Sequence, residues 1–317
     1  MMILEAKRLG FYVITLDPAA DCPAHSISDE HIIKPFTDEV AIFELAKKAD
    51  VITYEIEHIN VKALQKLEDA GHVIYPSVKS LRIIQDKFLQ KKTLAEKNIV
   101  IPEFVEIENI EDIKKAAESF GYPVMLKART GGYDGKGNAV IKSEDDIPKA
   151  FKMLGSGQVS LMAEQFIPFV NEISVIACRG IDGKKVIYPA AENIHKNSIL
   201  ELTIVPARIP DEAIQNARET ADKVMSIFEG VGTFCTEMFV TKSNQIYVNE
   251  IAPRPHNSGH YTIEGCYADQ FENHIRAVVR LTSREYGFNK THSYEKHIRH
   301  RKRNCRYIRN KRGICKI

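Results

Sequence analysis

Two glutamates on neighbouring apolar segments are the residues whose spacing points most directly to chemistry. Glu237 lies in "TFCTEMFVT" (233–241) and Glu250 in "IYVNEIAPR" (246–254), two β-rich runs with the pattern of a hairpin. If 242–245 form the loop, Thr241 faces Ile246, and the same register brings Glu237 opposite Glu250.

Opposed carboxylates repel each other, whereas a bound divalent cation turns that repulsion into a binding site. We therefore predict a magnesium site at Glu237 and Glu250, with Asn249 as an added neutral oxygen ligand. The alternatives are an exposed coincidence or a different strand register.

A dense polar loop follows directly, "APRPHNSGHYT" (252–262). Arg254 has the planar fork that binds a phosphate through two hydrogen bonds. His256, Asn257 and Ser258 are short polar groups on a segment stiffened by Pro and Gly. This density favours a binding site over a scaffold loop.

The segment "KARTGGYDGKGNAV" (127–140) allows two interpretations. Asp134-Gly135 is a strong turn signal, so the segment could be an ordinary hairpin. Alternatively, the four glycines let backbone N–H groups point at an anion while Lys127 and Lys136 supply charge, as in a phosphate cradle. The loop by itself leaves both open.

Two further acids, Glu164 and Glu172, stand on either side of a strand end broken by Pro168. Taken alone, each acid is most simply a solvated surface residue. Beside a phosphate loop and a metal pair they gain a role, because exposed backbone at 164–167 could bind an adenine edge and Glu172 a ribose hydroxyl.

Length and composition describe an ordinary globular chain. It has 317 residues, 44% hydrophobic and 27% charged, which suggests about two domains. No apolar run approaches the ~18 residues of a membrane span, and charges interrupt the start, so we expect a cytoplasmic protein without membrane contact. Six scattered cysteines without a C-x-x-C pair imply neither a zinc site nor a disulfide framework.

Helices alternating with short apolar runs predict parallel βαβ units at the start of the chain. We expect a helix closed by Gly10, strands at 11–18 and 49–59, and a helix at 60–71. The acids of "YEIEH" then lie at a strand's carboxyl end, where parallel sheets place ligands. Apolar spacing over 80–97 predicts a linker helix.

The end of the chain changes character. Residues 282–317 hold twelve Lys or Arg against two acids, a pattern that could bind nucleic acid. We favour a basic tail without a packed role, and nucleic acid as an unlikely partner.

The motifs "YPVMLKARTGGYDGKGN", "AEQFI", "NEIS", "ENIHKNSIL", "TEMFV" and "VNEIAPRPHNSGH" together resemble the ATP-grasp enzymes. Within them they resemble the PurK-type family, which makes 5-(carboxyamino)imidazole ribonucleotide in purine synthesis. The match runs from about residue 1 to about 279, and "GGYDGKG" and "NEIAPRPHNSGH" are specific to that branch.

The resemblance implies a mixed α/β and α+β architecture in three parts. Residues 1–79 form a truncated parallel α/β pre-ATP-grasp domain. Residues 80–281 form the ATP-grasp domain, with the linker helix 80–97, a lid at about 102–167 and a catalytic part at about 168–281. The basic tail 282–317 replaces the family's β-rich C-terminal domain.

The resemblance also implies a reaction. Bicarbonate attacks the γ-phosphate of MgATP, the resulting carboxyphosphate releases CO2, and the amine of aminoimidazole ribonucleotide captures it. Cofactors are then ATP and Mg²⁺, and the assembly is expected to be a homodimer.

The family pattern assigns residues to each role. The ATP-binding residues are Lys87, Lys127, Gly132, Tyr133, Asp134, Gly135, Lys136, Gly137, Asn138, Glu164, Gln165, Phe166, Ile167, Glu172, His195, Asn249 and Glu250. The substrate-binding residues are Glu55, Glu57, Tyr133, Lys136, Arg254, His256, Asn257 and Ser258. The catalytic residues are Arg254, Lys127, Glu237 and Glu250, the last two holding Mg²⁺.

Two departures from the family keep other functions open. First, the strand and G-x-G-Q-L-G turn with which family members begin do not precede "MM". Second, the composition of the tail is what translation in a shifted reading frame after about codon 280 would produce. The alternatives are a formate-dependent glycinamide ribonucleotide transformylase or another ATP-grasp ligase, and a catalytically inactive fragment that still binds MgATP.

Overall fold

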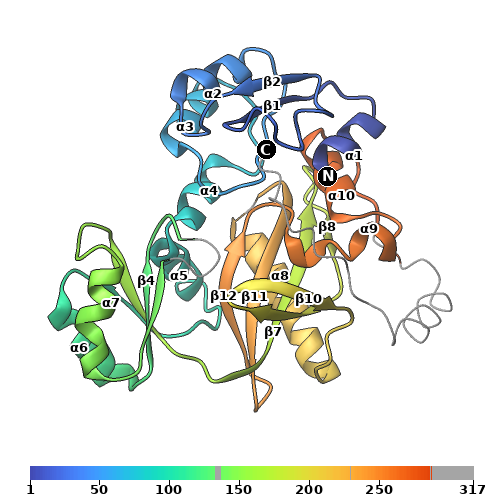
Figure 1. The fold of residues 1–317 in the computed structure, drawn as a ribbon. Helices are drawn as coiled ribbons and strands as arrows, with labels where there is room; N and C mark the ends of the chain where they lie inside the picture. Colours follow the sequence, from blue (N-terminus) through green and yellow to red (C-terminus); the bar gives the residue numbers. More distant parts are fainter. Residues whose placement is uncertain (133–136, 229, 286, 288–317) are drawn as a thin grey trace.

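The computed structural model describes residues 1–132, 137–228, 230–285 and 287. An N-terminal α/β unit stands above two sheet-containing units, with α4 (Val78–Gln85) and α5 (Lys87–Ala95) leading from the first to the others (Figure 1). Within the described ranges, no helix combines the length and apolar character that crossing a bilayer requires. The predictions for most of the tail, from residue 288 onward, lie outside the described residues.

The N-terminal unit contains a short parallel sheet, as predicted. Strand β1 (Ile14–Asp17) pairs in parallel with β2 (Glu30–Ile33). The helices of this unit are α1 (Met2–Arg8), α2 (Glu39–Ala46) and α3 (Val61–Asp69). Gly10 follows α1 with a φ of 86°, a conformation that favours glycine and ends the helix where the sequence indicated.

The predicted strand at 49–59 is wrong as a strand. Only Ile52 forms a bridge, in parallel with Ile74: its N–H donates to the Val73 carbonyl, and its own carbonyl accepts from the Tyr75 N–H. The following residues turn away and carry Glu55 and Glu57 toward the rest of the molecule instead of continuing a ladder.

A cavity of about 590 Å³ lies beside this bridge. Apolar side chains line it, among them Met2 of α1, Leu16 of β1, Ile42 of α2 and Ile52. None of the residues predicted to bind nucleotide or substrate lines it, so the candidate site must be sought elsewhere.

The predicted linker helix 80–97 is two helices, α4 (Val78–Gln85) and α5 (Lys87–Ala95). Asp86 separates them in an extended conformation, and its side chain accepts hydrogen bonds from the Phe88 and Leu89 N–H groups. An Asp that caps a helix in this way competes with continuation of the preceding helix. The break places Lys87 in the first turn of α5.

A four-stranded antiparallel sheet follows, in the order β3-β6-β4-β5. Its strands are β3 (Phe104–Ile107), β4 (Val124–Ala128), β5 (Asn138–Ile141) and β6 (Leu161–Gln165). Two helices, α6 (Ile110–Phe120) and α7 (Ile147–Met153), with the short η1 (Glu144–Asp146), accompany it. Ile113 of α6 and Ile147 of α7 bury against Leu126 and Ile141 of the sheet.

The third unit is a six-stranded sheet in the order β10-β9-β7-β11-β12, with β8 paired to β7. Its strands are β7 (Phe169–Arg179), β8 (Lys185–Ile187), β9 (Ala191–Lys196), β10 (Ile199–Ile204), β11 (Gly232–Thr241) and β12 (Ile246–Ala252). The helices are α8 (Asp211–Phe228), η2 (Asn257–Gly259), α9 (Thr262–Gly265) and α10 (Gln270–Val278).

The apolar face of α8 packs on this sheet, where Ala221, Val224 and Met225 join the core with Phe234 and Val248. Helix α10 packs against α1, so it joins the third unit to the first.

Candidate functional site

The hairpin β11–β12 brings Glu237 directly opposite Glu250, which confirms the predicted pair. The predicted loop is wrong by one residue, because Val240, not Thr241, faces Ile246. A register shift between Glu237 and Met238 compensates, so that Asn249 is the extra residue of a β-bulge. Asn249 and Glu250 then both reach lysines, Lys127 and Lys87 respectively.

Each of the two carboxylates has a cationic partner. An oxygen of Glu237 lies 2.9 Å from His256 Nε2, and an oxygen of Glu250 lies 2.7 Å from Lys87 Nζ. Burial opposes ionisation of Glu237, but His256, His195 and Lys87 outweigh it and lower the pKa of Glu237 to about 2. The site thus holds charged oxygens at neutral pH.

Burial likewise disfavours the charged form of Lys87, but the carboxylates of Glu250, Glu164 and Glu237 outweigh it and raise the pKa of Lys87. A cation is therefore held beside the acidic pair, where a phosphate oxygen could displace Glu250 as its partner.

Glu164 is not a solvated surface residue, contrary to the simplest expectation for it. Its carboxylate is buried and forms ion pairs with Lys127 and Lys91, the latter at 2.6 Å. Burial opposes ionisation of Glu164, but the two lysines outweigh it and lower its pKa to about 2. One carboxylate therefore fixes two cations next to the site.

Lys91 is a residue that sequence reasoning missed. It is 2% exposed, its ammonium donates to the Val248 carbonyl at 3.0 Å, and burial lowers its pKa to about 8. One signal could have identified it: Lys87 and Lys91 are four residues apart, so a helix carries both on one face.

The cavity between the lysines and the acidic strand β12 is small. A cavity of about 10 Å³ is lined by Lys87, Lys91, Lys127, Asn249 and Glu250, together with Gln90 and Met162. The Lys127 ammonium lies 3.5 Å from the Asn249 side-chain oxygen across it. Positive and negative groups thus converge from α5, β4 and β12 on one point.

The glycine segment is a hairpin at its base. Strands β4 and β5 are antiparallel, with Lys127 opposite Asn138, and the Ala128 N–H donates to the Gly137 carbonyl at 2.7 Å. Gly137 has a φ of 95°, and a Cβ there would meet the Gly132 Cα at 3.0 Å, so only glycine fits. Tyr133, Asp134, Gly135 and Lys136, predicted to bind nucleotide or substrate, lie outside the described residues.

Arg129 anchors this hairpin to α5. Its guanidinium pairs with Asp86 through Nε at 3.0 Å and Nη2 at 2.5 Å, and with Glu106, and it lies 4.9 Å from the centre of the Phe88 ring. The backbone adds a bond from the Lys87 N–H to the Arg129 carbonyl at 2.8 Å. The base of the loop and Lys87 therefore hold each other in place.

In the segment 164–167, predicted to bind adenine, the first two residues have their backbone paired in the sheet and the last two do not. Glu164 pairs with both β3 and β4, and the Gln165 N–H donates to the Glu103 carbonyl, so the backbone of these two residues is engaged in the sheet. Phe166 and Ile167 follow the last paired residue. The backbone of this segment that lies outside the sheet is accordingly at 166–167, where the Ile167 carbonyl accepts from the Phe169 N–H at 2.9 Å.

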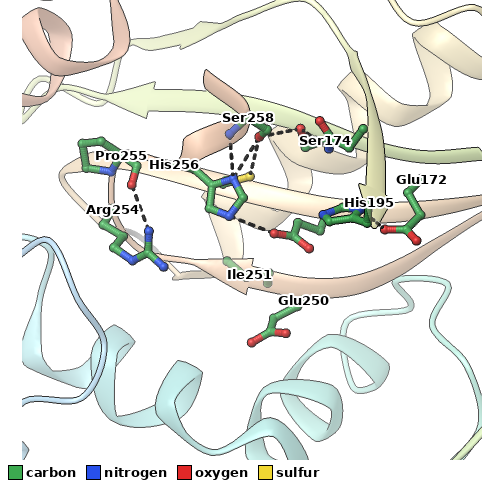
Figure 2. Close-up of polar contacts among 12 residues, drawn as sticks. Glu172, Ser174, His195, Glu250, Ile251, Arg254, Pro255, His256 and Ser258 are labelled. Atoms are coloured by element: carbon green, nitrogen blue, oxygen red, sulfur yellow. Dashed lines mark hydrogen bonds and ion pairs between the residues drawn. The ribbon is translucent and has the colours of Figure 1, made fainter. Parts of the chain in front are cut away.

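Glu172 and His195, predicted to lie near the nucleotide, are brought together by β7 and β9. A Glu172 oxygen lies 2.7 Å from His195 Nδ1, as Figure 2 shows. The pKa of His195 is raised, chiefly by Glu172, against the opposing effect of burial. Their pairing leaves one carboxylate oxygen of Glu172 free of that contact.

Arg254 and Glu57 connect the third unit to the first. Arg254 Nε donates to a Glu57 oxygen at 2.8 Å, and another guanidinium nitrogen donates to the Pro255 carbonyl at 3.1 Å. Glu55 lies close by; burial raises its pKa to about 7, while the chain's amino terminus and Arg254 act in the opposite direction. The predicted substrate residues of both units therefore meet.

The polar loop after β12 is shaped by Gln270. Its side chain accepts from the His256 N–H at 2.9 Å and donates to the His256 carbonyl at 2.7 Å. A Cβ on Gly259 would lie 2.4 Å from the Gln270 side-chain oxygen, so any larger residue there would push the Gln270 side chain away from its bonds to His256. Asn257 is exposed, whereas Ser258 is fully buried and faces His256 and Ser174.

Family models match the two parts of the chain separately. A ribonucleotide synthetase pre-ATP-grasp domain matches residues 1–85, and an ATP-grasp domain matches residues 92–271. The chain is 46% identical to a phosphoribosylaminoimidazole carboxylase of Schizosaccharomyces pombe, over 89% of this chain and 51% of that protein. It therefore spans about half the length of that relative.

Shorter relatives are covered more fully. The chain is 40% identical to an N5-carboxyaminoimidazole ribonucleotide synthase of Staphylococcus aureus, over 88% of this chain and 73% of that one. Its fold matches a crystal structure of the Aspergillus clavatus N5-carboxyaminoimidazole synthase in complex with ADP and 5-aminoimidazole ribonucleotide. That match has a TM-score of 0.84 and 39% identity, and covers 90% of this chain and 75% of that one.

Proposed function

The chain belongs to the ATP-grasp family, in the branch of N5-carboxyaminoimidazole ribonucleotide synthases, and from this we propose that it carboxylates 5-aminoimidazole ribonucleotide. The reaction consumes ATP and bicarbonate. Bicarbonate oxygen attacks the γ-phosphorus, ADP leaves, and the carboxyphosphate formed gives phosphate and CO2. The exocyclic amine then bonds to the CO2 carbon and loses a proton, which yields the carbamate.

The observation that carries the proposal is the convergence of buried cations on an opposed acidic pair. Lys87 and Lys127 come from α5 and β4, and Glu237 and Glu250 face each other on β11 and β12. Phosphoryl transfer depends on positioning and on neutralising phosphate charge, and these lysines supply that charge.

The acidic pair fits magnesium. Glu237, Glu250 and Asn249 offer hard oxygen atoms on adjacent strands, the donor type that Mg²⁺ binds together with phosphate oxygens. We propose Glu237 and Glu250 as the residues that hold it. When bound, the ion would neutralise charge on the phosphates, while the lysines and Asn249 hold the nucleotide in place.

Nucleoside recognition falls to the segment between the two sheets. We propose that backbone groups at 166–167 bind the adenine edge and that Glu172, oriented by His195, accepts from a ribose hydroxyl. We propose that the glycine loop 132–138 closes over the phosphates and excludes the water that would hydrolyse carboxyphosphate, with Gly137 at its base.

Arg254 and Glu57 mark the place of the second substrate. We propose that Arg254 binds the bicarbonate-derived oxygens and that Glu55 or Glu57 contacts the aminoimidazole ribonucleotide. The raised pKa of Glu55, about 7, suits a group that accepts the proton from the carboxylated amine at neutral pH. Buried Ser258 would act by orienting His256, and exposed Asn257 by contacting substrate directly.

The test measures ADP release by the purified chain with MgATP, bicarbonate and aminoimidazole ribonucleotide, each left out in turn. The proposal expects release to fall to background when either bicarbonate or the amine is missing. Release that ignores both would overturn it, and binding of MgATP without any release would identify a nucleotide-binding chain without turnover.

A homodimer, implied by the family, is a further proposal that light scattering on the purified chain would check.

A further inference from the structure

A second donor set shares Glu237 with the magnesium site. Cys235 Sγ, a Glu237 oxygen and a His256 ring nitrogen all lie within 4.8 Å of one another. Cys235 and Glu237 are two residues apart on β11, so their side chains are on the same face of the strand, and His256 reaches them from the loop after β12.

The chemistry of these donors differs from that of the oxygen pair. A thiolate and an imidazole are soft or borderline ligands, which Mg²⁺ does not favour and Zn²⁺ does. Three protein ligands are the number found in open zinc sites, where water takes the fourth position. The side chains of Glu237 and His256 are 27% and 15% exposed, which leaves an entry path for the ion.

Ser258 supports both of the softer ligands. Its hydroxyl lies 2.9 Å from His256 Nδ1 and 3.8 Å from Cys235 Sγ, and it accepts from Ser174 at 2.7 Å (Figure 2). In this structure the Ser258 N–H also donates to His256 Nδ1 at 3.3 Å, so a ring that binds metal through Nε2 must instead carry its proton on Nδ1, where the Ser258 hydroxyl can accept it. The same hydroxyl can donate its own proton to a thiolate. Hydrogen bonds of this kind fix the orientation of metal ligands.

We propose that Cys235, Glu237 and His256 form a binding site for Zn²⁺, with Ser258 as the positioning residue. Binding removes the thiol proton of Cys235, which passes to solvent, and moves the ring proton of His256 from Nε2 to Nδ1. No ligand changes its oxidation state.

The proposed zinc site predicts that Zn²⁺ and magnesium nucleotide compete for Glu237. Zn²⁺ bound by Glu237 would take part of the negative charge that this carboxylate offers to Mg²⁺ and place a second dication beside it, so bound zinc should weaken binding of magnesium nucleotide. This second step depends on the proposed function, whereas zinc binding itself does not. Zinc would then act as an inhibitor that occupies one carboxylate of the magnesium pair.

Sequence spacing gave no sign of this site. Cys235 and Glu237 are separated from His256 by a whole strand, and no C-x-x-C pair is present. Only the hairpin and the loop held by Gln270 bring the three ligands together.

The experiment replaces zinc by Co²⁺, whose bond to a thiolate gives an absorption band in the near ultraviolet. All variants carry Cys22→Ala, Cys305→Ala and Cys315→Ala, because these cysteines could bind cobalt elsewhere. In this background we expect a saturable band with one Co²⁺ per chain, displaced by Zn²⁺, and lost in Cys235→Ala.

Cys266→Ala is the matched control, since Cys266 is buried in the same apolar cluster as Cys235 but lies outside the donor set. It should keep the band. Circular dichroism and a thermal melt check that Cys235→Ala folds. A missing band in the background protein, or an unchanged band in folded Cys235→Ala, would overturn the zinc site.

A second measurement separates the competition from the site. We expect a saturating Zn²⁺ concentration to raise the dissociation constant for magnesium nucleotide at least about tenfold in the background protein, and to change it less than about twofold in Cys235→Ala. Loss of the band in Cys235→Ala without any competition would confirm the site and contradict its link to the magnesium pair.

Discussion

Lys91 Nζ lies 2.6 Å from a Glu164 oxygen, and both side chains are almost wholly buried. Disrupting a buried charged group is strongly destabilising, and Lys91→Met takes from Glu164 one of the two cations that offset its burial, leaving only Lys127. We expect Lys91→Met to lower the free energy of unfolding by about 3 kcal/mol. Denaturant titration checks this.

The control for that variant is Lys114→Met. Lys114 pairs with Glu111 at 3.3 Å, but both side chains are exposed, so the change should stay within about 0.5 kcal/mol. Equal losses in the two variants would contradict a special role for the buried group.

His274 should make the fold sensitive to acid. Its Nδ1 accepts from the Thr233 N–H at 3.1 Å, so the neutral ring carries its proton on Nε2, 2.7 Å from Thr53 Oγ1. Burial lowers the pKa of His274 to about 3. The unfolded chain therefore binds one more proton than the folded one between about pH 6.5 and pH 3, and stability falls as the pH falls through that window.

Within that window, the free energy of unfolding should fall because of His274 by at most about 1.4 kcal/mol for each pH unit. His274→Gln keeps hydrogen-bonding groups and removes the titration. Unfolding free energies of both proteins across pH 4 to 8 give the comparison, and parallel curves would refute the assignment.

The acidic pair should set the magnesium requirement. Replacing Glu237 and Glu250 by Ala removes two oxygen ligands, and we expect the affinity for magnesium nucleotide to fall at least about tenfold, or about 1.4 kcal/mol. Equilibrium binding at several magnesium concentrations is the measurement. Wild-type affinity in the double variant would leave the proposed function without its main support.

Arg129 should affect nucleotide binding without contacting it. Lysine cannot reproduce the two-nitrogen contact with Asp86, so Arg129→Lys loosens the base of the glycine loop and the first turn of α5. We expect the KM for ATP to rise about tenfold, consistent with the loss of a charge-assisted hydrogen bond. Arg82→Lys, on the exposed face of α4, should leave it unchanged.

Arg254 and Glu57 should act as a pair. In a double-mutant cycle with Arg254→Met and Glu57→Gln, we expect a coupling of about 1 to 3 kcal/mol in binding of aminoimidazole ribonucleotide. The pair joins residues 197 positions apart, so the cycle also reports whether the first and third units meet in solution. Additive effects would argue against that contact.

Sequence patterns predicted the helices and strands with strong periodicity, and they predicted that Glu237 lies opposite Glu250 on paired strands. The hairpin loop was wrong, because a bulge cannot be inferred from alternation alone, and the two errors cancelled at the glutamates. The break at Asp86 was missed because a helix-compatible spacing continues across it, whereas the capping bonds depend on the backbone.

Other features depended on tertiary context. The turn between β9 and β10 has positive φ at Asn197 and Ser198, the conformation of a tight hairpin, but lacks the glycine that usually signals it. Glu164 is buried together with Lys91 and Lys127, whose charges offset its own, which no single-residue preference for the surface can anticipate.

The bulge at Asn249 also separates the hairpin tip from the acidic pair Glu237 and Glu250. Residues 242–245 are exposed, and the ladder below them is already shifted by one residue before it reaches Glu237. A fluorescent label attached at exposed Ser243 would therefore report on the motions of strands β11 and β12 without changing the position of Glu237 opposite Glu250.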